Sequence, residues 1–284
     1  MANFRKTQHV RSISFPARSH PATIKAEEEL NKLKSLMIVS SSSSLKLDGI
    51  LSGLFGLSEL YNSVEEVLQL PLTQTALRQN QSSPEWLNRV LEDSIKHMDV
   101  CSGTRDLVIV LKDSLQNIQS SIRRRKSGLG SDVSNFQQSR KKMMKESAKL
   151  KYFSDMSENG SEDRDELQSA VMRVLKETSV MTLFMFQSLL SYVSGTAAAG
   201  SGKWSLVSKV LKQHGDCSEL DEMEMVLKKL MFSGDKKNDD CGMKYTMEKL
   251  EALNLGMEDV EDGLDRIFRC LIRERVTLLN VLSC

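Results

Sequence analysis

The side chains that could carry chemistry begin near the N-terminus, where arginine, serine and proline follow one another at a defined spacing. The segment from Arg11 to Pro16 has the form Arg-Ser-x-Ser-x-Pro, with serines at Ser12 and Ser14. Proteins of the 14-3-3 class bind this pattern when the second serine is phosphorylated. A phosphate on Ser14 would add about −1.5 to −2 charge and three acceptor oxygens for an arginine cluster of the partner. An arm rich in serine and arginine also produces such matches by chance, so both interpretations stay open.

A second group of residues is basic and occupies the middle of the chain. Its ten cations are Arg123, Arg124, Arg125, Lys126, Arg140, Lys141, Lys142, Lys145, Lys149 and Lys151. We favour a solvated helix face whose cations complement helix C-termini. Contact with anionic lipid, at about 1 kcal/mol per basic residue, or with an acidic partner comes second. A bipartite nuclear import signal, with 13 residues between the two clusters, comes third.

Ser127 and the aromatic content refine the interpretation of this basic region. Ser127 follows three cations and is a second candidate phosphorylation site, where a phosphate would reduce the local positive charge. Nucleic acid is not favoured as a partner, because only Phe136, Tyr152 and Phe153 interleave with the cations. The whole chain has 39 basic and 38 acidic residues, so its net charge of +1 would not steer it onto nucleic acid either.

Patterns for metal binding, phosphate binding or catalysis are weak. His97 with Cys101, and His214 with Cys217, are each spaced for one helix face, but the two pairs lie far apart without a local zinc knuckle. The segment 195–203 resembles a P-loop but does not match the motif, because lysine does not directly follow the second glycine. We therefore expect no enzyme activity, no metal, no cofactor and no small-molecule substrate.

The cysteines and the first residues bear on the compartment. Five cysteines without close pairing, and no apolar signal segment before them, indicate a reducing cytoplasmic location. The first 26 residues are basic and contain no acid, which fits a plastid transit peptide as well as a regulatory arm; we favour the arm. Because the basic region could contact anionic lipid or act as a nuclear import signal, a peripheral membrane location and a nuclear location are alternatives. The apolar stretch from Val180 to Val193 would span about 21 Å as a helix, short of a bilayer core of about 30 Å.

The elements that must position these residues are helices. Apolar residues recur at three-to-four spacing through most of the chain, and no segment alternates convincingly with period two. Helices are predicted over 21–37, 47–70, 84–98, 104–122, 131–153, 162–194, 203–213, 218–230 and 260–282. We expect an all-α, elongated bundle of long, mostly antiparallel helices. Residues 1–20 are expected to be a disordered basic arm, and residues 21–284 a single helical-bundle domain with a basic helix at 131–153 and an apolar central helix at 162–194.

Several short signals define the expected boundaries. The serines at 40–44 predict a linker, and Pro71 is expected to end the second helix. Thr104 is a candidate N-cap for the heptad that follows it. Ser218 with Asp221 three residues on resembles a capping box. In the last helix, a polar turn around Glu274 interrupts the apolar stripe.

Several phrases occur together in one order along the chain. They are Arg11-Ser-Ile-Ser-Phe-Pro16, Glu27-Glu-Glu-Leu-Asn-Lys-Leu-Lys34, Leu60-Tyr-Asn-Ser-Val-Glu-Glu-Val-Leu-Gln-Leu-Pro-Leu-Thr-Gln74, Met98-Asp-Val-Cys-Ser102, Ser139-Arg-Lys-Lys142, Lys203-Trp-Ser-Leu-Val-Ser208 and the ending 269–283. In this combination the chain resembles a plant-specific domain-of-unknown-function family related to the BYPASS proteins. The resemblance implies a helical, non-enzymatic plant protein associated with root and shoot development, and it supplies no catalytic residues.

These observations predict a non-catalytic adaptor or regulatory protein. It would bind protein partners through its helix faces, and phosphorylation of the N-terminal arm would set the choice of partner, with a 14-3-3 protein as one candidate. The alternative is a peripheral membrane protein that the basic residues of 123–151 hold on anionic lipid. Salt separates the two, because lipid binding of this kind weakens steeply as ionic strength rises.

Overall fold

The part of the chain that the structure describes is built from helices. The structure is a computed structural model that describes residues 20–42, 45–79, 85–124, 128–156, 166–195, 218–232 and 240–283. Its helices are α1 (Pro21–Ser42), α2 (Leu47–Leu68), α3 (Pro71–Gln79), α4 (Glu85–Arg123), α5 (Leu129–Met156), α6 (Glu166–Ser194), α8 (Glu219–Phe232) and α9 (Asp240–Ser283). No strand occurs within these ranges, and the predicted all-α class is confirmed.

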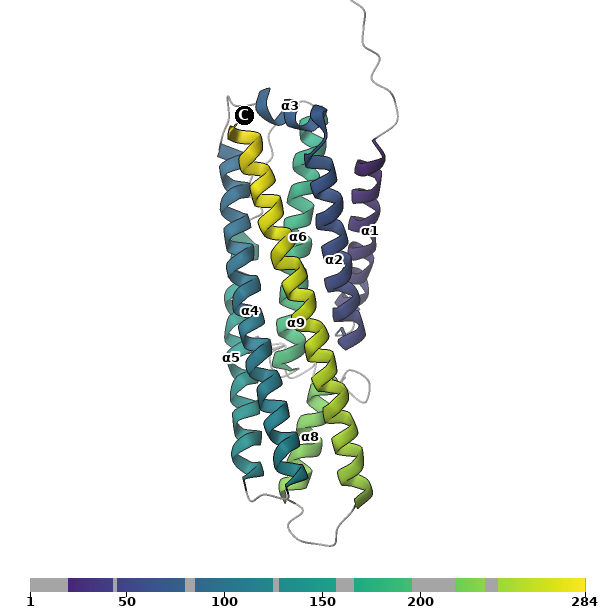
Figure 1. Cartoon of the computed structure of the whole chain (residues 1–284), viewed down its shortest axis with the longest axis vertical. Helices are drawn as coiled ribbons and strands as arrows, with labels where there is room; N and C mark the ends of the chain where they lie inside the picture. Colours follow the sequence, from purple (N-terminus) through teal and green to yellow (C-terminus); the bar gives the residue numbers. More distant parts are fainter. Residues whose placement is uncertain are drawn as a thin grey trace, which may run out of the picture.

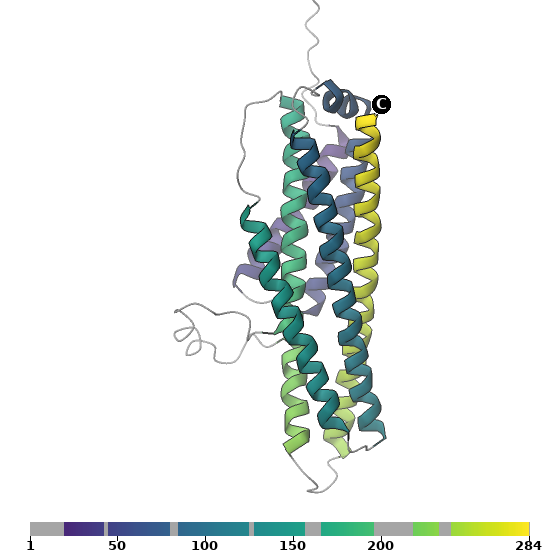
Figure 2. The same cartoon turned by 90° about the vertical axis from the view of Figure 1, so that its left-hand side faces the viewer.

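The long helices lie side by side and form an elongated bundle, with α3 lying across one end (Figure 1). α6 and α8 follow one another in a single column that runs beside α5 (Figure 2). At 1.5 Å per residue, the 44 residues of α9 extend about 66 Å. The 29 residues of α6 and the 14 of α8 together extend about 65 Å, so the two short helices match the length of one long helix.

The buried positions of α4 recur every three or four residues along most of its length, as expected for a helix packed lengthwise against its neighbours. They include His97, Cys101, Thr104, Val108, Leu111, Leu115, Ile118 and Ile122. The helix continues through Gly103 and Thr104, so the predicted break and N-cap at this point are wrong. Glycine costs a helix about 1 kcal/mol relative to alanine. Burying one large apolar side chain contributes about 1.5–3 kcal/mol, so the buried stripe outweighs that cost.

Other helix boundaries differ from the predictions at serines and at a proline. α1 extends to Ser42, into the segment 40–44 that the sequence predicts as a linker. α2 ends at Leu68, and Pro71 begins α3, which the sequence does not predict. Proline suits the first position of a helix, because an N–H at that position has no acceptor within the helix.

The remaining predicted helices are found with shifted ends. α5 corresponds to the basic helix predicted over 131–153, and α6 to the apolar helix predicted over 162–194. α9 begins at Asp240, well before the predicted apolar stripe, and runs without a break through Glu274. The arm over residues 1–19 and the helix predicted over 203–213 lie outside the described residues.

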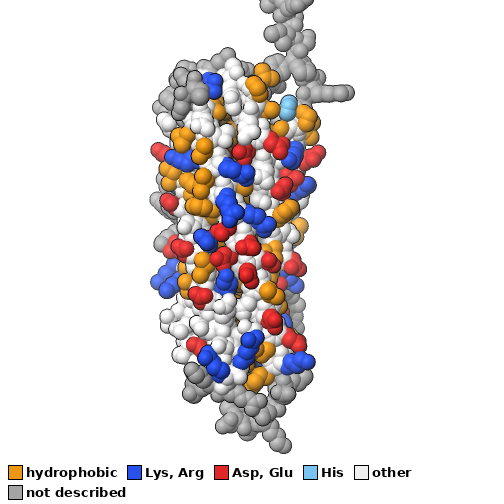
Figure 3. Space-filling view, viewed as in Figure 1, with side chains coloured by type: hydrophobic (Ala, Val, Ile, Leu, Met, Phe, Trp, Pro, Cys, Tyr) orange, Lys and Arg blue, Asp and Glu red, His pale blue; other side chains and the backbone are white. Residues whose placement is uncertain are grey.

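The buried apolar side chains form one cluster to which each of the described helices contributes, α3 through Leu77 alone. Ion pairs join helices at the surface, for example between Lys112 of α4 and Glu261 of α9. Figure 3 shows lysine, arginine and acidic side chains mixed over the face that α9 crosses. Within the described ranges, no helix is both long enough and apolar enough to cross a membrane.

Candidate functional site

The C-terminal end of α6 faces the N-terminal end of α8, and the side chain of Arg140 from α5 lies between the two ends. We call this place the joint between α6 and α8. The side chain of Arg140 is only 4% exposed. On α5, the buried residues Val133, Phe136, Arg140 and Met143 follow one another at three-to-four spacing, so Arg140 occupies a position that faces the core. Its guanidinium also lies over the ring of Phe136, 5.7 Å from the ring centroid. Arg140 is therefore a core residue despite its charge.

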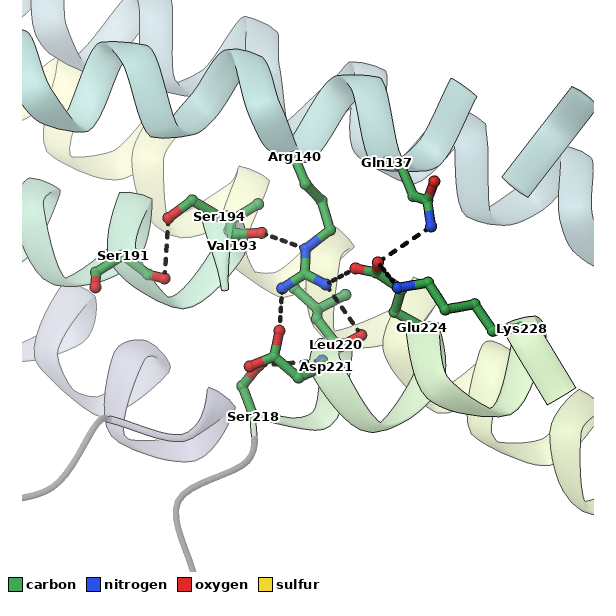
Figure 4. A network of polar contacts seen from close by, with 10 residues as sticks. All are labelled: Gln137, Arg140, Ser191, Val193, Ser194, Ser218, Leu220, Asp221, Glu224 and Lys228. Atoms are coloured by element: carbon green, nitrogen blue, oxygen red, sulfur yellow. Dashed lines mark hydrogen bonds and ion pairs between the residues drawn. The ribbon is translucent and has the colours of Figure 1, made fainter. Parts of the chain in front are cut away.

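Four groups from the two ends of the joint surround the Arg140 guanidinium (Figure 4). Its Nε donates to the backbone oxygen of Val193 at 2.8 Å, at the C-terminal end of α6. Its Nη1 donates to the backbone oxygen of Leu220 at 3.4 Å and to Glu224 Oε2 at 2.6 Å, and its Nη2 pairs with Asp221. We call these five residues the Arg140 cluster. The cluster holds the last turn of α6 and the first turns of α8 to the same side chain of α5.

The charges of the Arg140 cluster match the ends of the two helices. A cation is favourable at the C-terminus of α6 and unfavourable at the N-terminus of α8. The first turn of α8 compensates with acidic residues, among them Asp221. Ser218 caps this turn, because its Oγ accepts a hydrogen bond from the N–H of Asp221 at 3.2 Å. The predicted capping role of Ser218 is thus confirmed.

Glu224 contacts three donor side chains in and around the Arg140 cluster. Burial raises the pKa of Glu224, but Lys228 and Arg140 outweigh this and hold it below its ordinary value. Lys228 pairs with Oε1 of Glu224 at 2.7 Å, and Gln137 Nε2 donates to the same oxygen at 3.1 Å. Glu224 therefore stays ionised and contributes to stability at neutral pH.

The basic region predicted from the sequence is divided by this arrangement. Arg140 is buried in the cluster, so the expectation that it shares an exposed basic face is corrected. Lys141, Lys142 and Lys145 are exposed on α5, and Arg123 and Arg124 are exposed at the end of α4. The three-to-four spacing of buried residues in α5 is the sequence signal that separates Arg140 from the adjacent lysines.

The exposed cations form two separate groups. Lys141 lies 12 residues after the start of α5, which corresponds to about 18 Å of helix from the turn that joins α4 to α5. The other residues singled out from the sequence lie outside the described backbone or side chains. They are Arg11, Ser12, Ser14, Pro16, Arg125, Lys126, Ser127, Lys149 and Lys151.

A layer of polar side chains is buried in the centre of the bundle. Tyr61 of α2 and Thr182 of α6 share a hydrogen bond of 2.8 Å between their hydroxyls. His97 Nε2 of α4 and Ser179 Oγ of α6 lie 3.2 Å apart in a second hydrogen bond. Glu274 of α9 is 6% exposed, and its charge helps to raise the pKa of Tyr61, so it lies near this layer.

Glu274 is unusual because it is a buried acid without a cation. Burial raises its pKa to about 8. No hydrogen bond or ion pair to its side chain occurs among the described residues. The neighbouring Arg275 donates instead to the backbone oxygen of Leu91 and to Ser94 Oγ. Glu274 therefore carries a proton at neutral pH and behaves as a polar core residue.

The metal-binding pair considered from the sequence has other contacts. Cys101 is buried and donates its thiol hydrogen to the backbone oxygen of Leu264 at 3.4 Å. Burial lowers the pKa of His97 to about 4, and the ring contacts Ser179. His214 and Cys217 lie outside the described residues. Within the described ranges, no group of three or more His, Cys, Asp or Glu side chains could hold a metal ion.

Gly195 makes the close packing of the Arg140 cluster possible. It has φ +89°, and a Cβ at this position would overlap the guanidinium of Arg140 and the carboxylate of Asp221. We expect Gly195→Ala to lower the free energy of unfolding by about 2 kcal/mol, because alanine is strained at positive φ and the ion pair must move. Urea denaturation of the full chain measures this difference.

Gly103→Ala is the matched control for this prediction. Gly103 lies inside α4, and nothing lies within 4 Å of a Cβ built there. Alanine should raise the free energy of unfolding by about 0.5–1 kcal/mol through its higher helix propensity. Equal effects of the two substitutions would contradict the role assigned to Gly195.

A family model described as Protein BPS1 matches residues 53–281. This range includes every residue of the Arg140 cluster, the buried polar layer and the exposed lysines of α5. No curated protein and no solved structure matches the chain.

Proposed function

Because the chain belongs to the BPS1 family, we propose that it is a non-catalytic helical regulator of root and shoot development that acts by binding a protein partner. BPS1 is not a known enzyme family. The developmental role rests on the resemblance to the BYPASS proteins. The contacts of the buried charged residues also support a non-catalytic role. Arg140 and Glu224 form an ion pair with each other inside the fold, so their charges stabilise the structure.

The observation that carries this proposal is an exposed apolar stripe on α9. Ile272, Val276 and Leu279 are 42%, 49% and 39% exposed and recur at a spacing of four and three residues. The opposite side of the same segment is buried in the core through Leu271 and Leu278. An outward stripe at this spacing suits an amphipathic helix of a partner, whose own apolar side chains would pack against it.

A rescue experiment tests the proposal. In a plant line that lacks this protein, the wild-type chain should restore root and shoot growth. A chain with Ile272→Ser and Val276→Ser should fold with the same helix content but fail to restore growth, because its stripe is polar. Leu255→Ser is the matched control, since Leu255 is 58% exposed on another part of α9. Full rescue by the double variant would contradict the role of the stripe, and no rescue by the wild-type chain would contradict the developmental role.

The same assay addresses the N-terminal arm. We propose that a phosphate on Ser14 adds a 14-3-3 partner and so changes which complexes the bundle enters. A Ser14→Ala chain should then rescue incompletely although its bundle is unchanged. Rescue equal to that of the wild-type chain would remove phosphorylation of Ser14 from the proposal.

A second candidate function is attachment to anionic membranes. The observation in its favour is the exposure of Lys141, Lys142 and Lys145 on one stretch of α5. At about 1 kcal/mol per basic residue, these three lysines could strengthen membrane binding by roughly 100-fold. Arg140 makes no contribution, because it is buried in the Arg140 cluster.

Vesicle flotation tests this second function. The wild-type chain should float with vesicles that contain phosphatidylserine at low salt, and high salt should release it. Neutralising all three lysines to glutamine should lower the membrane partition coefficient by roughly 100-fold, whereas neutralising three exposed lysines elsewhere (Lys46, Lys176 and Lys244) should change it little. Binding that is insensitive to salt, or equal losses in both variants, would refute attachment through α5.

A further inference from the structure

Figure 1 shows α3 lying across one end of the bundle, beside the C-terminal ends of α2 and α9. One cavity is lined by residues from this end of the bundle. Its volume is about 270 Å³. It is lined by Gln69, Gln74, Arg78, Thr277, Asn280 and Val281. The lining residues come from α3, from α9 and from Gln69, which directly follows α2, so a molecule bound there would contact all three parts together.

Among the described residues, the lining of this cavity is polar and contains no acid. It presents one guanidinium, three carboxamides and one hydroxyl beside a single apolar side chain. The Nε of Arg78 is buried and has no hydrogen-bond partner. Among the described residues, no acid forms an ion pair with Arg78. A guanidinium in a concave site without an acidic partner creates a positive potential that attracts an anion.

The carboxamides around Arg78 are available to different degrees. Gln69 Nε2 already donates to Glu65 Oε1 at 3.3 Å, so this amide is partly engaged. The side chains of Gln74 and Asn280 make no hydrogen bond within the described part of the chain. Gln74 and Arg78 are four residues apart on α3 and therefore share one helix face. Their donors can converge on one bound group.

We propose that this cavity binds a small organic anion. Its carboxylate or phosphate group pairs with the guanidinium of Arg78, which matches two oxygens at once. Its remaining polar atoms accept hydrogen bonds from Gln74 and Asn280. The volume equals that of roughly nine water molecules, so the ligand is a compact metabolite-sized compound and not a polymer. The ligand is bound and released unchanged, and it holds α3 against the ends of α2 and α9.

Thermal unfolding of the full chain tests this proposal with defined probes. Inorganic phosphate and glycerol 3-phosphate represent the phosphate class, and succinate and citrate represent the carboxylate class. At constant ionic strength, set with chloride, one class should raise Tm along a saturating curve, because a ligand that binds only the folded state stabilises it. Isothermal titration calorimetry should give one site per chain. The class that saturates identifies the anionic group.

Variants of Arg78 locate the site. Arg78→Met should abolish the ligand-dependent rise in Tm, and Arg78→Lys should weaken binding about 10-fold, because lysine keeps the charge but lacks the fork. Arg89→Met, at an exposed position of α4, should bind like the wild-type chain. The proposal is wrong if no probe saturates up to about 10 mM. It is also wrong if the Arg78→Met chain binds the probe as tightly as the wild-type chain does. If the Arg78→Met chain does not fold, equally tight binding by the Arg78→Lys chain has the same meaning.

Discussion

Replacing Arg140 by methionine is expected to lower the free energy of unfolding by about 3 kcal/mol. Methionine fills a similar space but leaves Asp221 and Glu224 partly buried without the cation between them. Removing one partner of a buried ion pair costs about 3–5 kcal/mol in general, and Lys228 still compensates Glu224 here. The backbone oxygens of Val193 and Leu220 also lose their donor. Urea denaturation of the full chain, followed by circular dichroism, measures the change.

The neighbouring lysine provides the control. Lys141→Met changes an adjacent residue of the same charge on the exposed side of α5, so its effect should stay within about 0.5 kcal/mol. Adding Asp221→Asn to the Arg140→Met chain should recover about 1 kcal/mol, because it removes one unpaired charge. A loss below about 1 kcal/mol for Arg140→Met would contradict the central place of Arg140 between α6 and α8.

Replacing Glu274 by glutamine is expected to raise the free energy of unfolding at pH 7 by about 3 kcal/mol. The pKa of Glu274 is about 8 in the folded chain and about 4.5 when the chain is unfolded. Between these values the folded state keeps a proton that the unfolded state has released, so the stability of the wild-type chain falls as pH rises. The slope is about 1.4 kcal/mol per pH unit. Glutamine has the shape of the protonated acid and does not titrate.

The pH dependence distinguishes this effect from a general gain in stability. The difference between Glu274→Gln and wild type should be small near pH 4.5, grow up to about pH 8 and stay constant above it. Tyr61, which lies close enough to sense this charge, and His97 both remain neutral over this range, because burial raises the pKa of the first and lowers that of the second. Glu251→Gln, at an exposed position of the same helix, is the control and should show no such trend. A constant difference from pH 4.5 to 8 would contradict the burial of an uncharged Glu274.

The spacing of apolar residues is sufficient to predict the helical class and most of the long helices. It fails where local propensity and tertiary packing conflict. Gly103 and Thr104 have the residue types of a break and a cap, yet both lie inside α4 because the buried stripe passes through Thr104 without interruption. The short α3 is missed when Pro71 is interpreted only as an end, although proline also favours the start of a helix.

The charged residues of the core are harder to predict because their types suggest the surface. Arg140 follows the buried residues Val133 and Phe136 of α5 by seven and four positions. Glu274 likewise follows two buried residues of α9, Ile267 and Leu271, by seven and three positions. The position of these two residues in the buried stripe therefore indicates that they are buried, whereas their charge alone would indicate that they are exposed to solvent.

The sequence does not indicate which residues pair with Arg140. Asp221 lies 81 residues from Arg140 along the chain. Helical periodicity relates only residues within one helix, and these two lie on α5 and α8. Only the end-to-end arrangement of α6 and α8 brings them together.

The position of α9 between α2 and α4 has a consequence for biosynthesis. Cys101 of α4 bonds to Leu264, 163 residues later, and Asn62 of α2 accepts a hydrogen bond from Arg273, 211 residues later. While the ribosome is still translating the earlier helices, their inward apolar faces have no α9 to cover them. Such uncovered surfaces are the ones that chaperones bind and that aggregate. We therefore expect the nascent chain to need protection until α9 has been made.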